Sequence, residues 1–574
     1  MIIAILFSVV LFLAPLAPDV RLTRPKLLVL ELGIYSLLFA LILSQLYFNS
    51  LKYRKSPVIL PMAAYVAAQL AFYAISPDKP VALNELKRCL LSVSGFLVAA
   101  HALSSDQKWR KWALTAFISG GFLAAVYGLL QRSGGIGIIS VPRMDRIFST
   151  FGNPIFFAAH LIILIPVAAG VYLATKSKLA KILSLIVLAA TLAALYYSQT
   201  RAAFIACAAG AASLAWMLAP SGRIRRGGLA ATLIVFAIFA WFTKEIWFRQ
   251  QAHFLIWRDT LAMWSKYPWF GTGPGTFHVY FPSYASQALR AIWPQQQSII
   301  NDAHNEYIQS LAETGIVGFG IFAWLIITFL RSAYASFITS MAANKPLIAG
   351  LLAACISLLV QNFFSVDMRF IISSVYLFML FGFIESFNDS FVAVNVPHGA
   401  RNILAIGVIG AAAASYPAIL RPYIAQNHVA TTPDFFDERV LEPAKTIEDL
   451  QALAHKYPNQ SSIFERMAWV YAKERNFDKA IEQYLIANRL NPASPGPLNN
   501  LGNIYFLQND RAKAISYWEK SLQADPRQID SRLNLATAYY YNGQLKPCVD
   551  QLKATLKIDP HNEKAIVFLK RLTE

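Results

Sequence analysis

The sequence predicts an all-α protein in which a multi-pass membrane domain is followed by a helical solenoid. Of the 574 residues, 56% are hydrophobic and only 14% are charged, and the mean hydropathy is +0.44. A soluble protein carries about 25% charged residues on average, so a wholly soluble chain fits this composition poorly. Proline recurs with a fixed period near the carboxyl end, which is typical of a helical repeat array. We therefore predict a membrane domain over 1–425 and a repeat domain over 430–574.

The membrane domain is predicted from about thirteen apolar runs, several of them near the short limit for a spanning helix. They lie at about 2–17, 27–48, 57–76, 89–104, 112–130, 154–174, 180–198, 202–219, 228–243, 315–334, 345–363, 370–387 and 402–419. No basic stretch follows Met1, which favours a retained first helix over a cleaved signal peptide.

Charge predicts the topology. From Val429 onward there are 19 basic and 18 acidic residues, which leaves 32 of the 51 basic and 14 of the 32 acidic residues in the membrane part. The loops after alternate spans are basic: Lys52/Arg54/Lys55, Lys108/Arg110/Lys111, Lys176/Lys178/Lys181 and Arg223/Arg225/Arg226. The positive-inside rule assigns these loops to the cytoplasm. The loop with Arg143 and Arg146, the turn at Arg201, the long segment 244–314 and the repeat domain are then expected on the outer face.

Metal, disulfide and nucleic-acid chemistry have no support in the sequence. The four cysteines are too few and too scattered for a disulfide framework or a metal cage. The nine histidines show no pairing at i+3 or i+4. No zinc-finger, helix-turn-helix or RNA-binding signature is present. We expect no cofactor, no metal and no nucleic-acid partner.

The tail repeats every 34 residues. The repeated positions are Pro458/Pro492/Pro526/Pro560, Ala468/Gly502/Ala536 and Tyr471/Tyr505/Tyr539. This pattern is similar to the tetratricopeptide repeat, in which small residues lie where two helices touch and aromatic residues fill the seam. Such a solenoid offers a concave groove for a protein or peptide partner, with Asn500, Asn503 and Asn534 as candidate lining residues.

Three side chains on the predicted outer face suggest chemistry. Arg201 lies where one span ends and the next begins, and His304 precedes a span. Arg258 lies in an aromatic stretch before a Gly-rich turn, which is built on Pro268, Gly271, Gly273, Pro274 and Gly275. Arginines at the boundary can hold a diphosphate by forked hydrogen bonds, and an imidazole can take a proton from a hydroxyl. Structural alternatives remain for each: snorkelling to headgroups for Arg201, an interfacial anchor for the aromatic stretch, and a lone structural histidine for His304.

Three segments resemble, in chain order, the signature segments of the O-antigen ligase superfamily: SQTRAAFIACAAG, RDTLAMWSKYPWFGTGPGTF and HNEYIQSLAETGIVG. That superfamily also includes O-antigen polymerases and bacterial protein O-oligosaccharyltransferases. The resemblance covers about 140–390 and implies a glycosyltransferase-C-like fold. It also implies transfer of a glycan from undecaprenyl diphosphate at the periplasmic face of the bacterial inner membrane, without a metal or a nucleotide sugar.

The resemblance carries over residue by residue. The expected site residues are His304, Arg201 and Arg258 as catalytic groups, and Arg143, Arg146, Asn305 and Tyr307 as substrate-binding groups. Ala202 departs from the pattern, because many relatives have glycine after the arginine. We expect this change to alter packing more than chemistry.

The first functional hypothesis is therefore an O-antigen ligase-type glycosyltransferase with lipid A-core as acceptor. Within the same enzyme class, the acceptor could instead be a protein Ser/Thr or another growing glycan, and the repeat domain favours the protein. Two other classes are a lipid-linked glycan transporter and a membrane-tethered adaptor. A transporter would place charges at mid-membrane, and an adaptor would leave the Gly-rich segment and His304 unexplained.

Overall fold

The computed structural model describes the whole chain except residues 19–23, 49–50, 77, 137–138, 142, 223–226, 228–250, 293–299, 389–390, 429–445, 457–460, 492–493, 527, 560–561 and 574. Outside the described residues lie the predicted span 228–243, the predicted basic loop residues Arg223, Arg225 and Arg226, and the repeat prolines Pro458, Pro492 and Pro560. The chain separates into two compact units, one formed by residues 1–295 and 299–420 and one formed mainly by 421–574. The predicted boundary near 425–430 lies beside this division and stays a prediction.

The all-α fold is confirmed, because helices form nearly all of the regular structure. The first helices are α1 (Ile2–Leu13), α2 (Arg24–Tyr47), α3 (Ile59–Ile75), α4 (Lys79–Ala102), α5 (Gln107–Ser133), α6 (Pro154–Ala174), α7 (Lys178–Ser198) and α8 (Arg201–Leu218). After the gap follow α11 (Gln251–Lys266), α12 (Phe277–Tyr280), α13 (Gln287–Ile292), α14 (Glu306–Thr339), α15 (Lys345–Gln361), α16 (Ile371–Glu385) and α17 (His398–His428). Short 3-10 turns are η1 (Ser149–Phe151), η2 (Phe281–Ser283) and η3 (Asp367–Arg369).

Helix length and composition agree with a multi-pass membrane protein. Within the described residues, seven helices are long and apolar enough to cross a membrane, and four shorter apolar helices accompany them. Twelve of the thirteen predicted runs coincide with a helix, and the remaining run, 228–243, lies outside the described residues. The count of thirteen spans is not confirmed.

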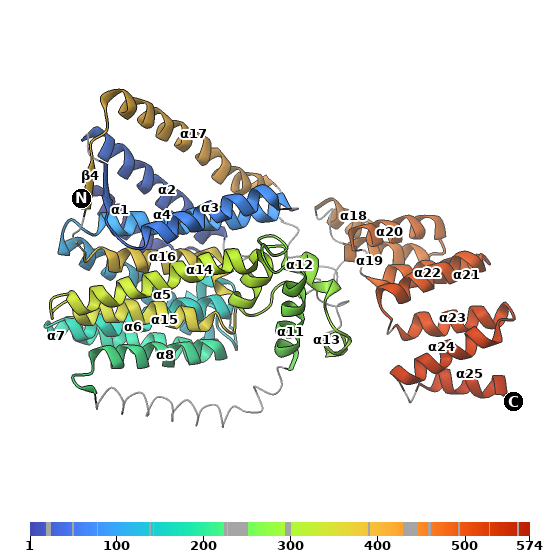
Figure 1. Cartoon of the computed structure of the whole chain (residues 1–574). Coiled ribbons are helices and arrows are strands. Elements are labelled where there is room, and N and C mark those ends of the chain that lie inside the picture. The colour runs from blue at the N-terminus through green and yellow to red at the C-terminus, as the bar shows by residue number, and fades with distance from the viewer. Residues whose placement is uncertain are drawn as a thin grey trace. The chain divides into compact units, whose positions relative to one another are not determined.

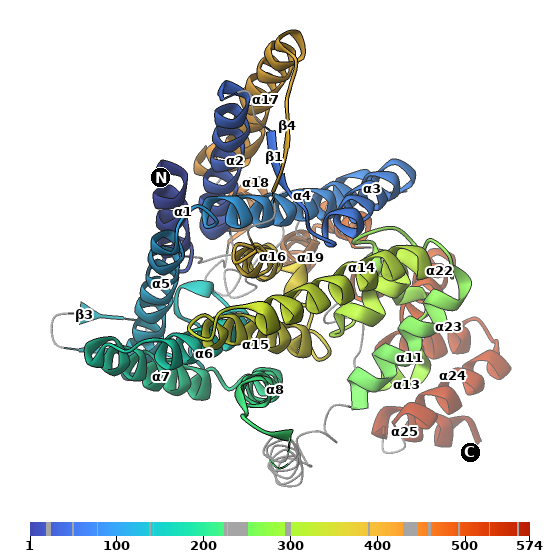
Figure 2. The same ribbon diagram turned by 60° about the vertical axis from the view of Figure 1, so that its left-hand side comes forward.

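The core of the first unit surrounds α16. Figure 2 looks almost along α16, which lies between α4 on one side and α14 and α15 on the other. Small residues let neighbouring helices approach closely, as is common inside membranes. A Cβ on Gly350 of α15 would lie 2.6 Å from the Pro166 carbonyl oxygen of α6, and a Cβ on Gly170 would lie 2.8 Å from the Pro346 carbonyl oxygen. These glycines therefore fix the α6–α15 contact.

Loops gather at two ends of this unit. At one, here called the basic end, β1 (Leu51–Arg54) pairs antiparallel with β4 (Phe391–Val394), visible in Figure 2. Arg110 at the start of α5 donates to the Ser386 carbonyl at 2.8 Å. Two of the predicted basic loops therefore meet the chain that leaves α16. A second short strand pair, β2 (Gly135–Ile136) with β3 (Ile139–Ser140), follows α5.

The other end, here called the site end, joins the connections α5–α6, α7–α8 and α15–α16. The Thr200 hydroxyl donates to the Pro154 carbonyl at 3.3 Å. The rings of Phe156 and Phe370 lie 3.6 Å apart between centroids. The segment that begins with α11 completes this end, and Figure 1 shows α11, α12 and α13 (green) beside it.

The segment from α11 to the start of α14 has a small apolar core of its own. Ile256 and Met263 of α11 are buried with Phe277, Phe281 and Leu289. The segment is therefore a folded element that can hold side chains in fixed positions. The interfacial anchor offered above as an alternative for this aromatic stretch stays a prediction, because Phe254 and Trp269 remain exposed beside this core.

The second unit is the predicted solenoid. Its helices are α18 (Ile447–Lys456), α19 (Ser461–Lys473), α20 (Phe477–Leu490), α21 (Pro495–Leu507), α22 (Arg511–Ala524), α23 (Ile529–Tyr541), α24 (Leu545–Ile558) and α25 (Glu563–Thr573). Consecutive helices pack as hairpins, and the repeated small residues are buried between them. Asn503 accepts from Trp518 Nε1 at 3.1 Å and from Asn534 Nδ2 at 2.9 Å. These asparagines therefore link helices within the solenoid.

Candidate functional site

His304 lies in a short loop that is pinned just before α14. The Ala303 N–H donates to Gln309 Oε1 at 2.7 Å, and the Ala303 carbonyl accepts from Trp257 Nε1 of α11 at 3.0 Å. His304 itself has a φ of +51°, an uncommon conformation for a residue with a Cβ. The loop therefore fixes the direction of the imidazole from both sides.

Asn305 and Tyr307 have clear structural partners. Asn305 is the N-cap of α14, and its Oδ1 accepts from the N–H groups of Tyr307 and Ile308, each at 3.0 Å. The Tyr307 hydroxyl donates to the Leu359 carbonyl at 2.7 Å, and its ring lies 4.4 Å from that of Phe363. These bonds give both residues a structural role, at the start of α14 and against α15. Their contact with substrate stays a prediction.

His304 has two titratable neighbours. Its Nδ1 lies 3.1 Å from Asp302 Oδ1. The His253 ring of α11 lies against it, with the ring centroids 4.6 Å apart. Burial, and then the adjacent His304, lower the pKa of His253 to about 4. His253 is therefore neutral at neutral pH, and Asp302 is the charged neighbour of His304.

Arg146 and Arg201 come together at the α7–α8 turn. Arg146 Nε donates to the Ser198 carbonyl at 2.9 Å, and its Nη2 donates to the Thr200 hydroxyl at 3.3 Å. The pKa of Arg146 is lowered, first by burial and then by the charge of Arg201. Two guanidinium groups that repel each other favour binding of an anion between them. Arg143 lies exposed in the same loop as Arg146.

Arg258 is held by an ion pair on α11. Its Nη2 and Nε lie 2.9 and 3.0 Å from Asp259 Oδ1, and Nη2 also donates to the Ser286 hydroxyl at 2.7 Å. The Ser286 N–H in turn donates to Asp259 Oδ2 at 2.8 Å. Asp259 and Ser286 therefore hold the Arg258 guanidinium in place, and the side chain is still 58% exposed to solvent.

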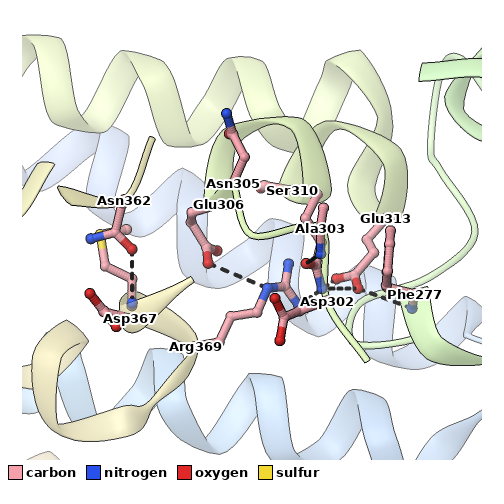
Figure 3. Close-up of polar contacts among 12 residues, drawn as sticks. Phe277, Asp302, Ala303, Asn305, Glu306, Ser310, Glu313, Asn362, Asp367 and Arg369 are labelled. Atoms are coloured by element: carbon pink, nitrogen blue, oxygen red, sulfur yellow. Dashed lines mark hydrogen bonds and ion pairs between the residues drawn. The ribbon is translucent and has the colours of Figure 1, made fainter. Parts of the chain in front are cut away.

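A buried ionic network lies beneath the His304 loop (Figure 3). Arg369 of η3 reaches between two carboxylates of α14: its Nε lies 3.3 Å from Glu306 and its Nη1 lies 2.8 Å from Glu313. Arg88 of α4 pairs with Glu85 and donates to the Met368 carbonyl at 2.8 Å. Removing one member of such a buried network would leave an uncompensated charge, which is strongly unfavourable.

Glu313 also binds the Gly-rich turn. Its carboxylate accepts from the N–H groups of Gly275 at 2.8 Å and Phe277 at 3.1 Å. The turn lies directly against a kink in α14 at Gly315, where φ is +64° and ψ is −172°. A Cβ on Gly271 would lie 2.2 Å from the Glu313 carbonyl carbon, and a Cβ on Gly315 would lie 2.2 Å from that of Trp269. Glycine is required at both positions, because backbone meets backbone.

A polar cavity adjoins the network. Its lining includes Tyr65 and Gln69 of α3 together with the charged groups Glu85, Arg88 and Arg369. No three metal-ligating side chains converge anywhere in the part of the chain that the structure describes. The two guanidinium groups in this lining, Arg88 and Arg369, are paired with the carboxylates of Glu85, Glu306 and Glu313.

The predicted site residues lie in three groups at the site end. Arg146 with Arg201 forms one group, Arg258 a second, and His304 a third. Among the described residues, no hydrogen bond or ion pair joins His304 directly to the predicted arginines.

The predicted site residues did not include His253 and Asp302 beside His304, Asp259 beside Arg258, or the separate buried network of Glu306, Glu313 and Arg369. The alternative of a structural role for His304 stays a prediction, although His304 is not isolated, because the His253 ring contacts it. The one available signal was the spacing of Glu306 and Glu313, which places two carboxylates on one face of a helix in an apolar setting.

Comparison with known proteins agrees with this division of the chain. The O-antigen ligase family matches residues 185–323, and the tetratricopeptide repeat family matches residues 495–528. A UDP-N-acetylglucosamine–peptide N-acetylglucosaminyltransferase of Giardia intestinalis is 29% identical over 93 residues, which are 16% of this chain and 6% of that protein.

Two solved structures also align with the chain. A tetratricopeptide protein of Thermus thermophilus has 20% identity, covers 30% of this chain and 98% of its own, and gives a TM-score of 0.22. Yeast Tom70 has 13% identity, covers 83% and 95%, and gives a TM-score of 0.24.

Arg201, Arg258 and His304 all lie within the matched range 185–323. The chain therefore carries an O-antigen ligase family segment in its membrane unit and a tetratricopeptide repeat domain after it.

Proposed function

We propose that this protein transfers a glycan from undecaprenyl diphosphate to a hydroxyl group of lipid A-core at the periplasmic face of the inner membrane. The observation that carries the proposal is the His304–Asp302 pair within the O-antigen ligase segment. The same end of the membrane unit holds the adjacent cations Arg146 and Arg201.

The transfer needs one proton acceptor, and His304 is suited to that role. The acceptor oxygen forms a bond to the anomeric carbon of the glycan, and the bond from that carbon to the diphosphate oxygen breaks. The hydroxyl proton goes to His304 Nε2, because Nδ1 already faces the Asp302 carboxylate. The departing diphosphate keeps the electron pair of the broken bond.

The arginines would stabilise that leaving group. A guanidinium binds phosphate oxygens by two parallel hydrogen bonds, and such preformed positive charge lowers the barrier when negative charge develops. Binding a diphosphate between Arg146 and Arg201 would also relieve their mutual repulsion. Arg258 keeps an accessible guanidinium and is the third candidate. Arg143, exposed in the same loop as Arg146, would extend the anion site.

Charge supports the proposed orientation. The loops at the basic end carry Lys52, Arg54, Lys108 and Lys111, which favour the cytoplasm. Helices that alternate in direction then carry the site end to the periplasm. The lipid-linked donor would approach from the outer leaflet.

A second candidate acceptor is a protein Ser or Thr. The tetratricopeptide unit supports it, because such solenoids bind peptides and partner proteins along their concave face. The chemistry at the anomeric carbon would be the same, and only the source of the hydroxyl would differ.

The test uses the purified full-length protein with undecaprenyl diphosphate-linked glycan and each acceptor separately, and mass spectrometry identifies the modified product. His304→Ala should lose about 10²–10⁴-fold in transfer rate, as loss of a general base does. Arg201→Lys should also be impaired, because lysine keeps the charge but loses the forked geometry. Wild-type turnover in His304→Ala would exclude His304 as the base. If the wild-type protein modifies neither lipid A-core nor the protein acceptor, the proposed transfer is excluded.

A further inference from the structure

Asp302 contacts His304 at two points. Its Oδ1 accepts from the His304 backbone N–H at 3.0 Å and lies 3.1 Å from the imidazole Nδ1. A carboxylate cannot donate, so an Asp302 oxygen 3.1 Å from Nδ1 favours the neutral tautomer that carries its hydrogen on Nδ1. In that tautomer Nε2 has a free lone pair.

The surroundings limit which other groups can set the charge of His304. The side chains of His304 and Asp302 are 32% and 26% exposed, so the pair is neither deeply buried nor fully solvated. On the α11 side lies His253, whose pKa is lowered to about 4 by burial and by His304. On the η3 side, burial raises the pKa of Asp367 to about 7, and the charge of Asp302 adds to this effect. Asp302 is therefore the carboxylate that acts directly on His304.

We propose that Asp302 is a positioning residue for the transfer reaction, which holds the His304 tautomer and stabilises the imidazolium that forms when Nε2 takes the acceptor proton. This inference rests on the proposed function of His304 as the base. Asp302 itself touches neither the glycan nor the diphosphate in this scheme. It acts through the ring of His304 alone.

A purely structural role for Asp302 makes a different prediction. The contact with the His304 backbone N–H is a turn that asparagine can also make, because its side-chain carbonyl is an equal acceptor. Asp302→Asn therefore keeps the turn and the side-chain shape and removes the charge. Its amide can also donate to Nδ1 and favour the wrong tautomer.

The experiment measures kcat and kcat/KM of the purified full-length protein between pH 5 and 9. Asp302→Asn should lower kcat on the order of 10²-fold. It should also move the acidic limb of kcat/KM to lower pH, because the imidazolium loses its counter-charge. Asp302→Glu keeps the carboxylate, so its kcat and its acidic limb should both lie closer to those of the wild-type protein. The matched control is Asp106→Asn at the basic end, where asparagine can still cap α5 and no change is expected.

The outcomes separate this inference from the proposed function. An unmoved acidic limb in Asp302→Asn, with or without a fall in kcat, would overturn the positioning role. A lower thermal midpoint with the limb unmoved would assign Asp302 to the fold of the loop. If His304→Ala transfers at the wild-type rate, the proposed function itself fails. If His304→Ala is inactive and Asp302→Asn behaves as wild type, only this inference fails.

Discussion

Replacing Gly315 by alanine tests whether the Gly-rich turn must dock against α14. A Cβ at this position would lie 2.2 Å from the Trp269 carbonyl carbon and oxygen and 2.4 Å from the Phe270 nitrogen. The φ of +64° and ψ of −172° belong to a region that is almost restricted to glycine. The turn and the helix would have to separate.

The expected cost follows from these contacts. The backbone strain amounts to about 1–3 kcal/mol, and forcing a methyl group into a packed contact costs about 1–3 kcal/mol more. Separation also weakens the hydrogen bonds from the Ile316 N–H to the Pro268 carbonyl at 2.9 Å and from the Gly273 N–H to the Glu313 carbonyl at 2.8 Å. At about 1 kcal/mol each, the total is about 4–8 kcal/mol against the docked turn. Displacement of site groups by about 1 Å can cost 10²-fold in rate.

The assay compares Gly315→Ala with Gly320→Ala at equal membrane abundance. Gly320 lies on the same helix, and no heavy atom comes within 4 Å of an added Cβ. Gly320→Ala should therefore keep its activity and melt at the same or a slightly higher temperature, because alanine favours a helix over glycine by about 0.5–1 kcal/mol. Gly315→Ala should lose at least about 10²-fold in transfer and melt at lower temperature. Wild-type transfer and melting in Gly315→Ala would refute the idea that this contact builds the site.

Two further predictions concern other parts of the chain. Deletion of 430–574 should leave transfer to a small soluble acceptor intact and reduce modification of the native acceptor, because solenoid repeats contact mainly their neighbours; equal loss of both activities would contradict this. His253→Phe should flatten the acid side of the stability profile. The pKa of His253 is about 4 when folded and 6.5 in an unperturbed chain, so the unfolded state binds more protons between these values. Wild-type stability should then fall as pH drops from about 6.5 to 4, and identical slopes in thermal melts of both proteins would exclude this contribution.

The helices and the repeat were accessible from the sequence for simple physical reasons. A spanning helix requires a long apolar run, so the composition alone predicts α6 and α14. The solenoid repeats small residues such as Gly502, which lies against Trp518 with an added Cβ only 2.5 Å from its Nε1. Local pattern was sufficient in both cases.

The partners of the site residues were not accessible in this way. Arg369 pairs with Glu306 and Glu313 across the intervening helix α15, and no local period marks such a contact. His253 meets His304 only because α11 folds back onto the loop through Trp257. The motif residues were found through family resemblance, whereas their electrostatic setting depends on tertiary packing.

The dependence of Glu313 on Arg369 has a consequence for how the protein is made. Glu306, Glu313 and the Gly-rich turn leave the ribosome before η3 does. Until η3 arrives, both carboxylates lack their buried counter-charge, and the turn lacks its fixed anchor. We expect the site to assemble late in synthesis, once α15 and α16 have been inserted. A nascent chain that ends after α14 would contain every motif residue and still have no working site.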